Sequence, residues 1–403
     1  MTLSLDFYGE SVELSGNDAA LAELARDFSY FLAPRSAAGA LRLELRVGAP
    51  AERPAGWASF RTSRYHVHDR GACRRIAYED GAQVKYDYSH RRGLIVAPNE
   101  TRLRELGYLA VLSRAGEALD RRGLHRVHAF GLDRAGSGVL LLLPSGGGKS
   151  ALTLEALRRG GADILSDDSP LVDGRGDLHA FPLGLGLRRP VPDIPRDRQR
   201  LFRRRDYAEK WIVDAEYFKE RIAPRSALRL ILIGRRAGAR EPLFRPAGPA
   251  AALAALTVNL VVGVGLAQMT EYVLGAEPSH VGRWARIAAA RAAVAARLSL
   301  GVPAYRFELG TDPARNWDAL DAFLRSVLTA RSRFSGVSVG RTTASAGRLT
   351  MNSVSMRPGA ISTNVLTPAE SSPSMASCQR TRWSSWAASF RRSWAGADAG
   401  RPS

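Results

Sequence analysis

Cysteine is scarce in this sequence, which holds only Cys73 and Cys378 among its 403 residues. Two cysteines exclude a disulfide framework and any zinc cluster built on cysteine ligands. Their scarcity suits a reducing compartment, so we expect a cytoplasmic location. Lysine is also rare, since it supplies four of the 58 basic residues and arginine supplies the rest.

A clear membrane-spanning segment is lacking as well. The first 16 residues, MTLSLDFYGESVELSG, contain three acidic residues and no long apolar run, unlike a secretory signal. The most apolar stretch, Ala250–Met269, is interrupted by Thr257, Asn259 and Gln268. We therefore predict a buried helix or helix–strand pair there and expect no association with a membrane.

Acidic residues are outnumbered, 39 against 58 basic ones, which gives a net charge of +19. Residues 331–403 contain ten arginines but only Glu370 and Asp398, so residues 1–330 carry +11. The positive charge of residues 1–330 suits phosphate-bearing or acidic ligands. Because no run of basic residues dominates it, we do not expect nucleic-acid binding.

The pattern of strands and helices predicts three regions. Residues 1–98 contain short runs that alternate apolar and polar residues, such as Leu41–Val47, which predict a β-rich domain with a small antiparallel sheet and a helix near Ala19–Leu32. Residues 99–330 alternate strands with helices, which predicts an α/β domain. Residues 331–403 hold 16 serines and no hydrophobic period, so we predict a disordered tail or a sequence artefact, such as translation past a frameshift.

Several boundaries inside the α/β region are marked by local signals. Asn99 is a predicted N-cap of a helix of about twenty residues that ends at Gly123. A second helix is predicted to stop at Gly160 and Gly161, and a hairpin to turn at Asp173–Gly176.

The strongest functional signal is the segment Leu140–Leu154, LLLLPSGGGKSALTL. A strand leads into a glycine-rich loop, and a helix follows at once, which is the arrangement of a phosphate-binding loop. Glycines allow amide groups to surround phosphate oxygens, and the helix N-terminus favours negative charge. The pattern predicts ATP and Mg²⁺ as ligands, with Lys149 on the β- and γ-phosphates and Ser150 on the metal. The predicted nucleotide-binding residues are Ser145, Gly146, Gly147, Gly148, Lys149 and Ser150.

One position departs from this pattern, because Leu143 stands where the motif has its first glycine. The departure affects the entry to the loop, whereas Gly146–Gly148 still supply its flexible part. A glycine-rich turn that merely caps a helix is the alternative interpretation.

A second signal, Ile164-Leu165-Ser166-Asp167-Asp168, follows the predicted helix. Open α/β sheets bind ligands at the carboxyl ends of their strands, so a carboxylate pair there is suited to phosphoryl transfer. One carboxylate can orient or deprotonate an acceptor hydroxyl while the other holds a metal. A surface turn that caps the next element is the alternative interpretation.

Taken together, these residues resemble a known family. His128-Ala-Phe-Gly, Ser-Gly-Gly-Gly-Lys-Ser, a helix ending in Arg-Arg-Gly-Gly, and Leu-Ser-Asp-Asp resemble the catalytic domain of HPr kinase/phosphorylase, whose fold is related to phosphoenolpyruvate carboxykinase. The resemblance is specific over residues 125–190. The N-terminal region, Glu209–Asp214 and Ile222-Ala223-Pro224 look more like HPr-kinase-like tailoring proteins of peptide biosynthesis, some of which phosphorylate a serine of a lasso-peptide precursor.

The resemblance implies a role for each matching residue. Asp167 would be the base toward the acceptor hydroxyl, with His128 close to it, and Asp168 would lie near the metal or phosphates. Lys149 and Ser150 would keep their phosphate and Mg²⁺ roles. The family's metal-ligating glutamate has no acidic counterpart in Phe181–Gly186, which favours a divergent branch with another substrate. Family members are often hexameric, so the resemblance also implies a homo-oligomer.

Other candidates have simpler interpretations. His66 and His68 share a strand face with Asp69 close by, but no third ligand is evident, so we expect a solvated face. We expect an exposed His125 and a structural His179. Arg188 and Arg189 could face a phosphate or an acidic peptide. Lys210 is notable because lysine is rare, although Tyr207 and Trp211 could equally indicate packing around it.

Two main function classes and a third option follow. The first is an ATP-dependent kinase that phosphorylates a serine of a peptide or protein, plausibly a peptide natural-product precursor. The second is a nucleotide-binding scaffold or regulatory ATPase without kinase activity, and a small-molecule kinase on the same scaffold is a third option.

Overall fold

The computed structural model describes residues 1–48, 58–203, 205, 209–238, 241–264, 266 and 278–335. Residues Met1–Ser338 belong to one compact unit. The predicted tail, 331–403, lies outside the described residues except for its first five, which continue the last helix to Ser335.

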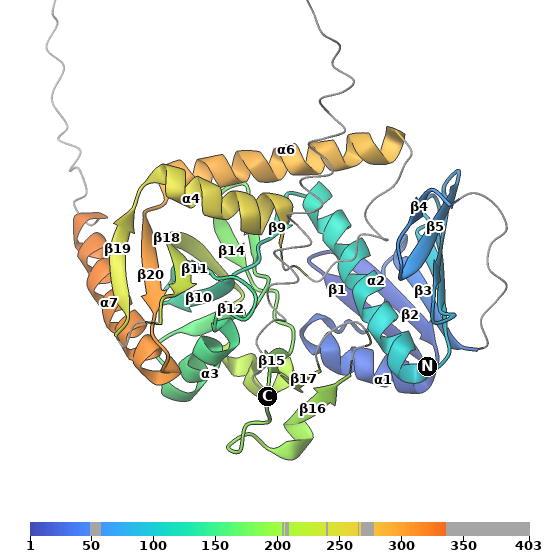
Figure 1. Ribbon diagram of the computed structural model, residues 1–403, viewed down its shortest axis with the longest axis horizontal. Coiled ribbons are helices and arrows are strands. Elements are labelled where there is room, and N and C mark those ends of the chain that lie inside the picture. The colour runs from blue at the N-terminus through green and yellow to red at the C-terminus, as the bar shows by residue number, and fades with distance from the viewer. Residues whose placement is uncertain are drawn as a thin grey trace, which may run out of the picture. The chain divides into compact units, whose positions relative to one another are not determined.

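The first sheet is mixed and has eight strands (Figure 1). Its strand order is β1-β2-β3-β8-β7-β6-β5-β4, and the pairs β2–β3 and β3–β8 are parallel. The prediction of a small antiparallel sheet is therefore wrong. A helix, α1 (Asp18–Asp27), connects β2 to β3 and returns the chain to the same end of the sheet, which makes that pair parallel. The strands are β1 (Thr2–Phe7), β2 (Glu10–Gly16), β3 (Leu41–Val47), β4 (Phe60–Arg61), β5 (Tyr65–Arg70), β6 (Cys73–Tyr78), β7 (Gln83–Asp87) and β8 (Arg92–Ala97).

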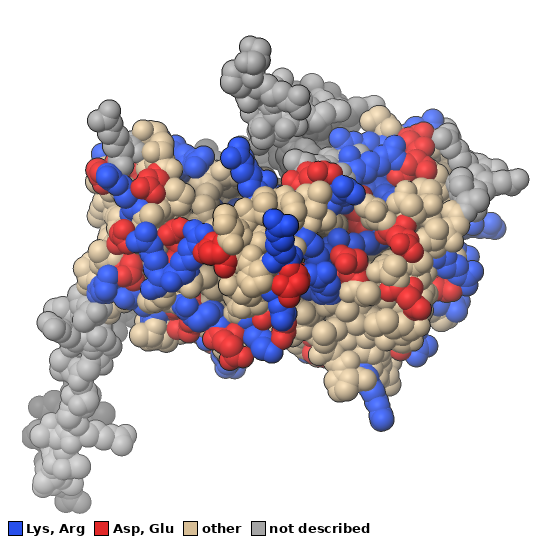
Figure 2. Space-filling model, turned by 90° about the horizontal axis from the view of Figure 1, so that it is seen from below, with Lys and Arg blue, Asp and Glu red and all other residues tan. Residues whose placement is uncertain are grey.

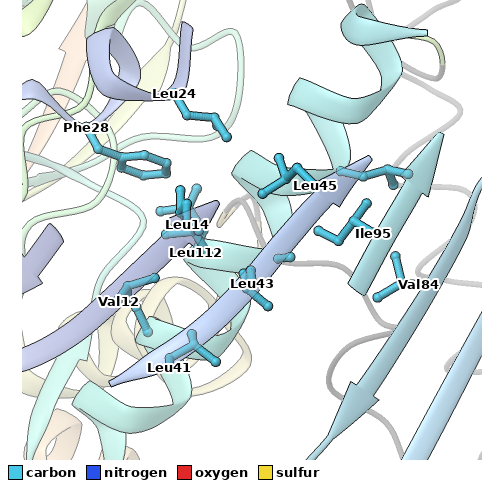
Figure 3. Packing of buried hydrophobic residues seen from close by; sticks show 14 of the residues in the cluster. Val12, Leu14, Leu24, Phe28, Leu41, Leu43, Leu45, Val84, Ile95 and Leu112 are labelled. Atoms are coloured by element: carbon cyan, nitrogen blue, oxygen red, sulfur yellow. The ribbon is translucent and has the colours of Figure 1, made fainter. Parts of the chain in front are cut away.

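Helices α1 and α2 (Glu100–Arg121) cover this sheet and complete its core. The predicted N-cap of α2 is confirmed, because the Asn99 side chain accepts a hydrogen bond of 2.9 Å from the Arg102 amide. Figure 3 shows Leu112 of α2 beside Leu14 of β2, with Leu43 and Leu45 of β3 nearby. Although α2 follows the predicted domain boundary, its apolar face belongs to the core of the first sheet.

The second sheet has nine strands, of which β11, β18 and β20 are mutually parallel. Its other pairs are antiparallel, so it is a mixed α/β sheet. The carboxyl ends of the three parallel strands lie at one edge. The strands are β9 (Leu124–Arg126), β10 (Phe130–Arg134), β11 (Ser137–Leu142), β12 (Asp163–Ser166), β13 (Leu171–Asp173), β14 (Asp177–His179), β18 (Arg225–Arg236), β19 (Leu243–Ala247) and β20 (Ala304–Leu309).

Helices bury both faces of the second sheet (Figure 1). On β11, Leu140 and Leu142 face α4 (Pro249–Leu256) and α6 (Pro278–Gly301), whereas Leu141 faces α3 (Lys149–Arg159) and α7 (Pro313–Ser335). This burial on both faces explains why β11 is a continuous apolar run. The predicted stop of α3 is confirmed, since Gly160 and Gly161 both adopt positive φ.

A third, small sheet lies between the first sheet and the second sheet. It is formed by β15 (Leu185–Leu187), β17 (Lys210–Val213) and β16 (Gln199–Phe202). Arg200 on β16 pairs with Asp27 of α1 at 2.7 Å and with Asp214 at 2.9 Å. Short 3₁₀ segments complete this part of the chain: η1 (Ser29–Phe31), η2 (Arg196–Arg198) and η3 (Ala215–Arg221).

The most apolar stretch forms a helix in its described part. Helix α4 continues into a π-helical turn, η4 (Thr257–Val262), where Leu256 and Leu260 are buried while Val258 and Val262 are exposed. The rest of the stretch lies largely outside the described residues. Among the helices of the described chain, none is both long and apolar enough to cross a bilayer.

Candidate functional site

The glycine-rich loop joins the end of β11 to the first residue of α3, Lys149. Gly146 and Gly148 have φ angles of 73° and 109°, which residues with a side chain rarely adopt. A Cβ on Gly147 would lie 2.8 Å from the carbonyl oxygen of Pro144. All three glycines are therefore needed for this loop shape, which presents the first turn of a helix to a ligand.

Leu143 fits at the entry of the loop because its side chain turns into the core. It is completely buried, and a Cβ on Gly234 of β18 would lie 2.6 Å from its Cδ2 atom. The missing side chain at Gly234 thus makes room for Leu143. The departure from the motif changes the packing beneath the loop and leaves Gly146–Gly148 in place.

Lys149 is buried and turned inward. Its Nζ atom lies 2.8 Å from Nε2 of His128, 3.0 Å from the Leu143 carbonyl oxygen and 3.3 Å from Oδ1 of Asp168. The side chain is 6% exposed. The amine therefore lies directly under the loop, where phosphate oxygens would compete with these three partners.

Asp167 faces helix α3. Its carboxylate accepts a hydrogen bond of 2.8 Å from the Ser150 hydroxyl and lies 2.6 Å from the Thr153 hydroxyl. Burial, together with the charge of neighbouring Asp168, raises the pKa of Asp167, although the two hydroxyls and Lys149 oppose this shift. Thr153, one helical turn after Lys149, was not singled out from the sequence; its spacing from Ser150 on the helix is the signal that could have found it.

Asp168 faces the other way, toward the segment between β9 and β10. Its Oδ1 atom lies 3.2 Å from Nε2 of His128, and its side chain is 49% exposed. Desolvation acts to raise the pKa of Asp168, but the hydrogen bond with His128 and the positive charge of Lys149 outweigh it and hold that pKa well below its usual range. The resemblance implies that His128 accompanies Asp167; in the structure His128 contacts Asp168 instead.

The chain around the two aspartates is fixed by its own hydrogen bonds. The Ser169 amide donates to the Ser166 hydroxyl at 3.0 Å, and that hydroxyl donates to the Phe181 carbonyl at 2.8 Å. The His128 amide donates to the Asn259 carbonyl. These bonds form a turn after β12 that directs the neighbouring carboxylates to opposite sides.

The residues present fit a magnesium ion on one side of this turn. The Ser150 hydroxyl and the Asp167 carboxylate are hard oxygen ligands, and they already lie 2.8 Å apart. Within the described ranges, no group of three or more His, Cys, Asp or Glu side chains gathers as a metal cluster. Phe181–Gly186 supplies no acid; Phe181 and Leu185 of this segment are both buried in hydrophobic clusters.

Two basic residues, Lys210 in the third sheet and Arg188 directly after its strand β15, lie near the candidate site. A Cβ on Gly146 would lie 3.8 Å from an Arg188 guanidinium nitrogen. The charge of Lys210 is one of those that lower the pKa of Asp168. Both side chains are exposed. Tyr207 lies outside the described residues, and Arg189 is exposed beyond β15.

The remaining histidines have structural partners. His125 is buried against Asp120 at 2.8 Å, so the expectation that it is exposed is wrong. His179 pairs with Asp173 at 3.0 Å, and its ring contacts Tyr8. Asp69 pairs with Arg74 at 2.7 Å, while His66 lies 3.6 Å from Glu79.

Comparisons with known proteins give no family assignment. No family model matches the chain, and no curated protein matches it. Among solved structures, the HPr(Ser) kinase/phosphatase from Coxiella burnetii is similar, with 13% sequence identity and a TM-score of 0.27 over 52% of this chain and 94% of that one. At this level of similarity, the function of the chain has to be argued from its own residues.

Proposed function

We propose that this chain is an ATP-dependent kinase that transfers the γ-phosphate to a serine hydroxyl of a peptide or protein. The observation that carries the proposal is the convergence of Lys149, Ser150 and the two aspartates on one glycine-rich loop. A helix N-terminus, a buried amine and a hydroxyl–carboxylate pair are the groups that phosphoryl transfer requires. A turn that only caps a helix needs neither the amine nor the carboxylates.

Binding of the nucleotide would change the partners of Lys149. The loop amides and the amine would hold the β- and γ-phosphates, so Lys149 would leave His128 and Asp168. Ser150 and Asp167 would hold the magnesium ion, which neutralises phosphate charge when it is bound. This assignment exchanges the roles that the resemblance implies for the two aspartates, because Asp167 rather than Asp168 contacts Ser150.

Asp168 would act toward the acceptor. Its side chain is half exposed, so an incoming serine can reach it, and His128 at 3.2 Å keeps it oriented. The serine oxygen forms a bond to the γ-phosphorus, the bond from that phosphorus to the β,γ-bridging oxygen breaks, and the serine proton passes to Asp168. ADP leaves. Departure of Lys149 removes a positive charge that lowers the pKa of Asp168, which makes that carboxylate a better base once the nucleotide is bound.

The serine acceptor comes from the resemblance, while the positive charge around the site bears on the charge of the acceptor. Arg188 lies beside Gly146 of the loop, and the charge of Lys210 acts on Asp168. Both cations suit an acidic peptide or the phosphate being transferred. A cytoplasmic location and a homo-oligomeric state remain predictions.

The test is transfer of labelled γ-phosphate from ATP to synthetic serine peptides, one of them ending in serine. Asp168→Asn should abolish transfer while retaining ATP binding, and Asp167→Asn should weaken binding chiefly in the presence of magnesium. Asp163→Asn is the matched control, because Asp163 lies at the other end of β12 and pairs with Arg221 at 2.9 Å. Normal transfer by Asp168→Asn would contradict the assigned role.

A nucleotide-binding scaffold or regulatory ATPase is the second candidate. The absence of an acid from Phe181–Gly186 favours it, because phosphoryl transfer is helped by a complete metal sphere. The destination of the label separates the two functions. Label on the peptide indicates a kinase, label in water indicates an ATPase, and label retained on ATP indicates a scaffold.

A further inference from the structure

The outer surface of α4, η4 and α6 carries exposed apolar side chains. These three elements pack side by side over one face of the second sheet (Figure 1). Large apolar side chains are exposed along all of them: Leu253, Val258, Val262, Val281 and Leu300. Single exposed side chains of this kind are common, but a contiguous apolar patch on a protein surface marks an interaction site.

Helix α6 carries an apolar stripe along its exposed side. Its members recur every three or four residues, which places them on one face of the helix: Val281, Ala285, Ala288, Ala292 and Leu300. All of them are exposed, and Leu300 is exposed by 79%. The side of α6 toward the sheet is a different one, and it holds the buried Val294 and Leu298. The core of this chain therefore does not use the stripe.

The arginines of α6 lie beside the stripe rather than in it. Arg283 pairs with Glu117 of α2 at 2.8 Å, and Arg297 donates a hydrogen bond of 2.5 Å to the Gly174 carbonyl. Ala295, which borders the stripe on its other side, is buried in one cluster with side chains of α4 and η4. The stripe thus adjoins α4, whereas the arginines adjoin α2 and the hairpin after β13.

The neighbouring elements extend the stripe without adding charge. The sequence Pro249–Val262, which forms α4 and η4, contains no charged residue. Its outward side chains include Leu253, Val258 and Val262. We call the stripe and these side chains together the apolar helical face. A face without charge gives an acidic or basic partner no group to recognise, so its occupant has to be apolar as well.

The apolar helical face is large enough for a specific contact. Helix α6 has 24 residues and is therefore about 36 Å long, and α4 with η4 adds about 20 Å. With a helix diameter of about 10 Å, the face can bury roughly 500–600 Å² on each of two copies. The total of about 1,100 Å² exceeds the ~1,000 Å² that a specific interface needs.

The composition of the face favours a second copy over a lipid surface. Helices that lie in a membrane interface present Trp, Phe or Leu to the lipid, whereas alanine dominates the stripe. Small side chains allow two helices to approach closely, to about 8 Å between their axes. In a two-fold dimer the same patch meets itself, which an uncharged face of small side chains permits without repulsion at the contact.

We propose that two copies of this chain associate through the apolar helical face, with α6 of one copy packed against α6 of the other. The proposal goes beyond the proposed function and does not depend on it, because the face lies on α4, η4 and α6 and includes no residue of the glycine-rich loop or the aspartate turn.

The experiment measures sedimentation of the full chain over a range of concentrations and gives the Kd of the dimer. Ala292→Arg places a charge in the stripe and should weaken the dimer about tenfold or more, because a charge without a partner is costly to bury. Leu253→Arg tests the α4 side of the face and should act in the same direction. Ala290→Arg is the matched control, since Ala290 is exposed on the arginine side of α6; it should change Kd by less than about twofold.

Salt separates an apolar contact from a charged one. The chain carries a net charge of +19, so two copies repel each other through solvent, and added salt should tighten the dimer by screening this repulsion. A dimer that weakens as salt is added would be held by charge and would overturn the proposal. Urea unfolding of each variant checks that it remains folded, which we expect because the substituted side chains are exposed.

Three further results would overturn the proposal. A full chain that stays monomeric at every concentration would exclude the dimer, and equal weakening by Ala292→Arg and Ala290→Arg would place the contact elsewhere. A monomeric chain that floats with vesicles of phosphatidylcholine and phosphatidylserine, and no longer does so as Ala292→Arg, would assign the face to a lipid surface. Calorimetry with ATP tests the proposed function separately, because none of these substitutions touches the glycine-rich loop.

Discussion

The packing of Leu143 against Gly234 shows how one residue can replace the first glycine of a phosphate-loop pattern. Leu143 ends the buried strand, and its carbonyl oxygen still accepts a hydrogen bond from Lys149. The side chain occupies the space that a Cβ on Gly234 would need. The loop tolerates the leucine because a glycine distant in sequence compensates for it.

We therefore expect Gly234→Ala to destabilise the protein by about 1–3 kcal/mol through overpacking. Leu143→Ala alone should cost about 2–5 kcal/mol because it leaves a cavity. The double variant should be more stable than the sum of the two effects predicts, since each change relieves the other. Urea unfolding of the four proteins measures this coupling. Additive effects would show that the two side-chain positions do not compete for the same space.

His128 gives a prediction about pH. Its hydrogen bond is one of the interactions that hold the pKa of Asp168 low against desolvation, so Asp168 stays ionised to a lower pH than an ordinary aspartate. His128→Phe removes that bond, and the pKa of Asp168 should rise. If Asp168 is the base, the acid limb of the pH profile of kcat/KM should move to higher pH.

Lys210→Met provides a milder version of the same experiment at an exposed position, because it removes a more distant positive charge. This variant should also move the acid limb of the pH profile of kcat/KM to higher pH, by a smaller amount than His128→Phe does. A profile that does not move in either variant would show that Asp168 does not limit the rate at low pH.

The end of helix α2 is tied to two other elements through buried charge. Asp120 accepts hydrogen bonds from Arg291 of α6 at 2.9 and 2.5 Å and lies 2.8 Å from Nδ1 of His125 in β9. The Arg126 guanidinium packs against Gly116 of α2. A Cβ atom on Gly116 would lie 2.4 Å from a nitrogen of this guanidinium. These contacts, rather than apolar packing alone, connect the helix of the first sheet to the second sheet.

Loss of the contacts that Asp120 makes with His125 and Arg291 should destabilise the protein in a pH-dependent way. Desolvation acts to raise the pKa of Asp120, but His125 and Arg291 lower it below its ordinary value. The stabilisation is therefore fully present above pH ~3.9 and is lost as the pH falls through the lower pKa of the folded state. Asp120→Asn should cost about 3–5 kcal/mol near neutral pH, because it leaves buried positive charge without its partner.

Urea unfolding between pH 3 and 7 measures this effect, and the difference between the two proteins should narrow at the acid end. Asp318→Asn is the control, since it removes an exposed pair with Arg159 and should cost less than about 1 kcal/mol. If Asp120→Asn and Asp318→Asn lose equal free energy of unfolding, burial does not make the contacts of Asp120 more stabilising than an exposed pair.

Elements with local signals could be predicted from the sequence, and elements defined by distant pairing could not. Asn99, Gly160 and Gly161 mark helix ends within a few residues, and the hairpin turn at Asp173–Gly176 is confirmed by the pairing of β13 with β14. Alternation in Leu41–Val47 predicts a strand but does not say that its neighbours are parallel.

The same limit applies to the candidate site. The motif identifies Lys149, Ser150 and the aspartates because they lie within twenty residues of one another. Arg188 comes to the loop only through the folding of the third sheet, which no local pattern shows. Which groups Asp167 and Asp168 each face also depends on the turn after β12, and the Asp-Asp dipeptide alone does not reveal that turn.

At the scale of the whole molecule, a shared core links the first sheet to the candidate site. Phe181 stacks on Phe7 with ring centres 5.8 Å apart and contacts Phe31 at 5.0 Å. Its amide donates to the Leu165 carbonyl, and its own carbonyl accepts from Ser166, next to Asp167. Packing of the N-terminal strands therefore supports β12, which leads into the turn that carries Asp167 and Asp168.

Charge is spread over the surface of the same unit. Figure 2 shows basic and acidic side chains intermixed over the visible face, with no stripe of one sign. Many exposed charges of the described residues are paired, as are Arg158 with Asp193 at 2.7 Å and Arg159 with Asp318 at 2.7 Å. Such exposed pairs contribute little stability individually, so the shared core has to supply most of it.

The shared core leads to a prediction about shortened chains. Residues Met1–Ser338 form one compact unit, so a chain that ends at Ser338 should unfold at the same urea concentration as the full chain and bind ATP equally well. A chain that begins at Asn99 loses β1 to β8, which cover the apolar face of α2 and the ring of Phe181. It should fail to give a cooperative unfolding transition, because burial of that surface is a main source of stability. Circular dichroism during urea titration and calorimetry with ATP measure both properties. Cooperative unfolding and ATP binding by the chain that begins at Asn99 would show that the second sheet is an independent domain, and that the N-terminal strands do not hold the aspartates in place.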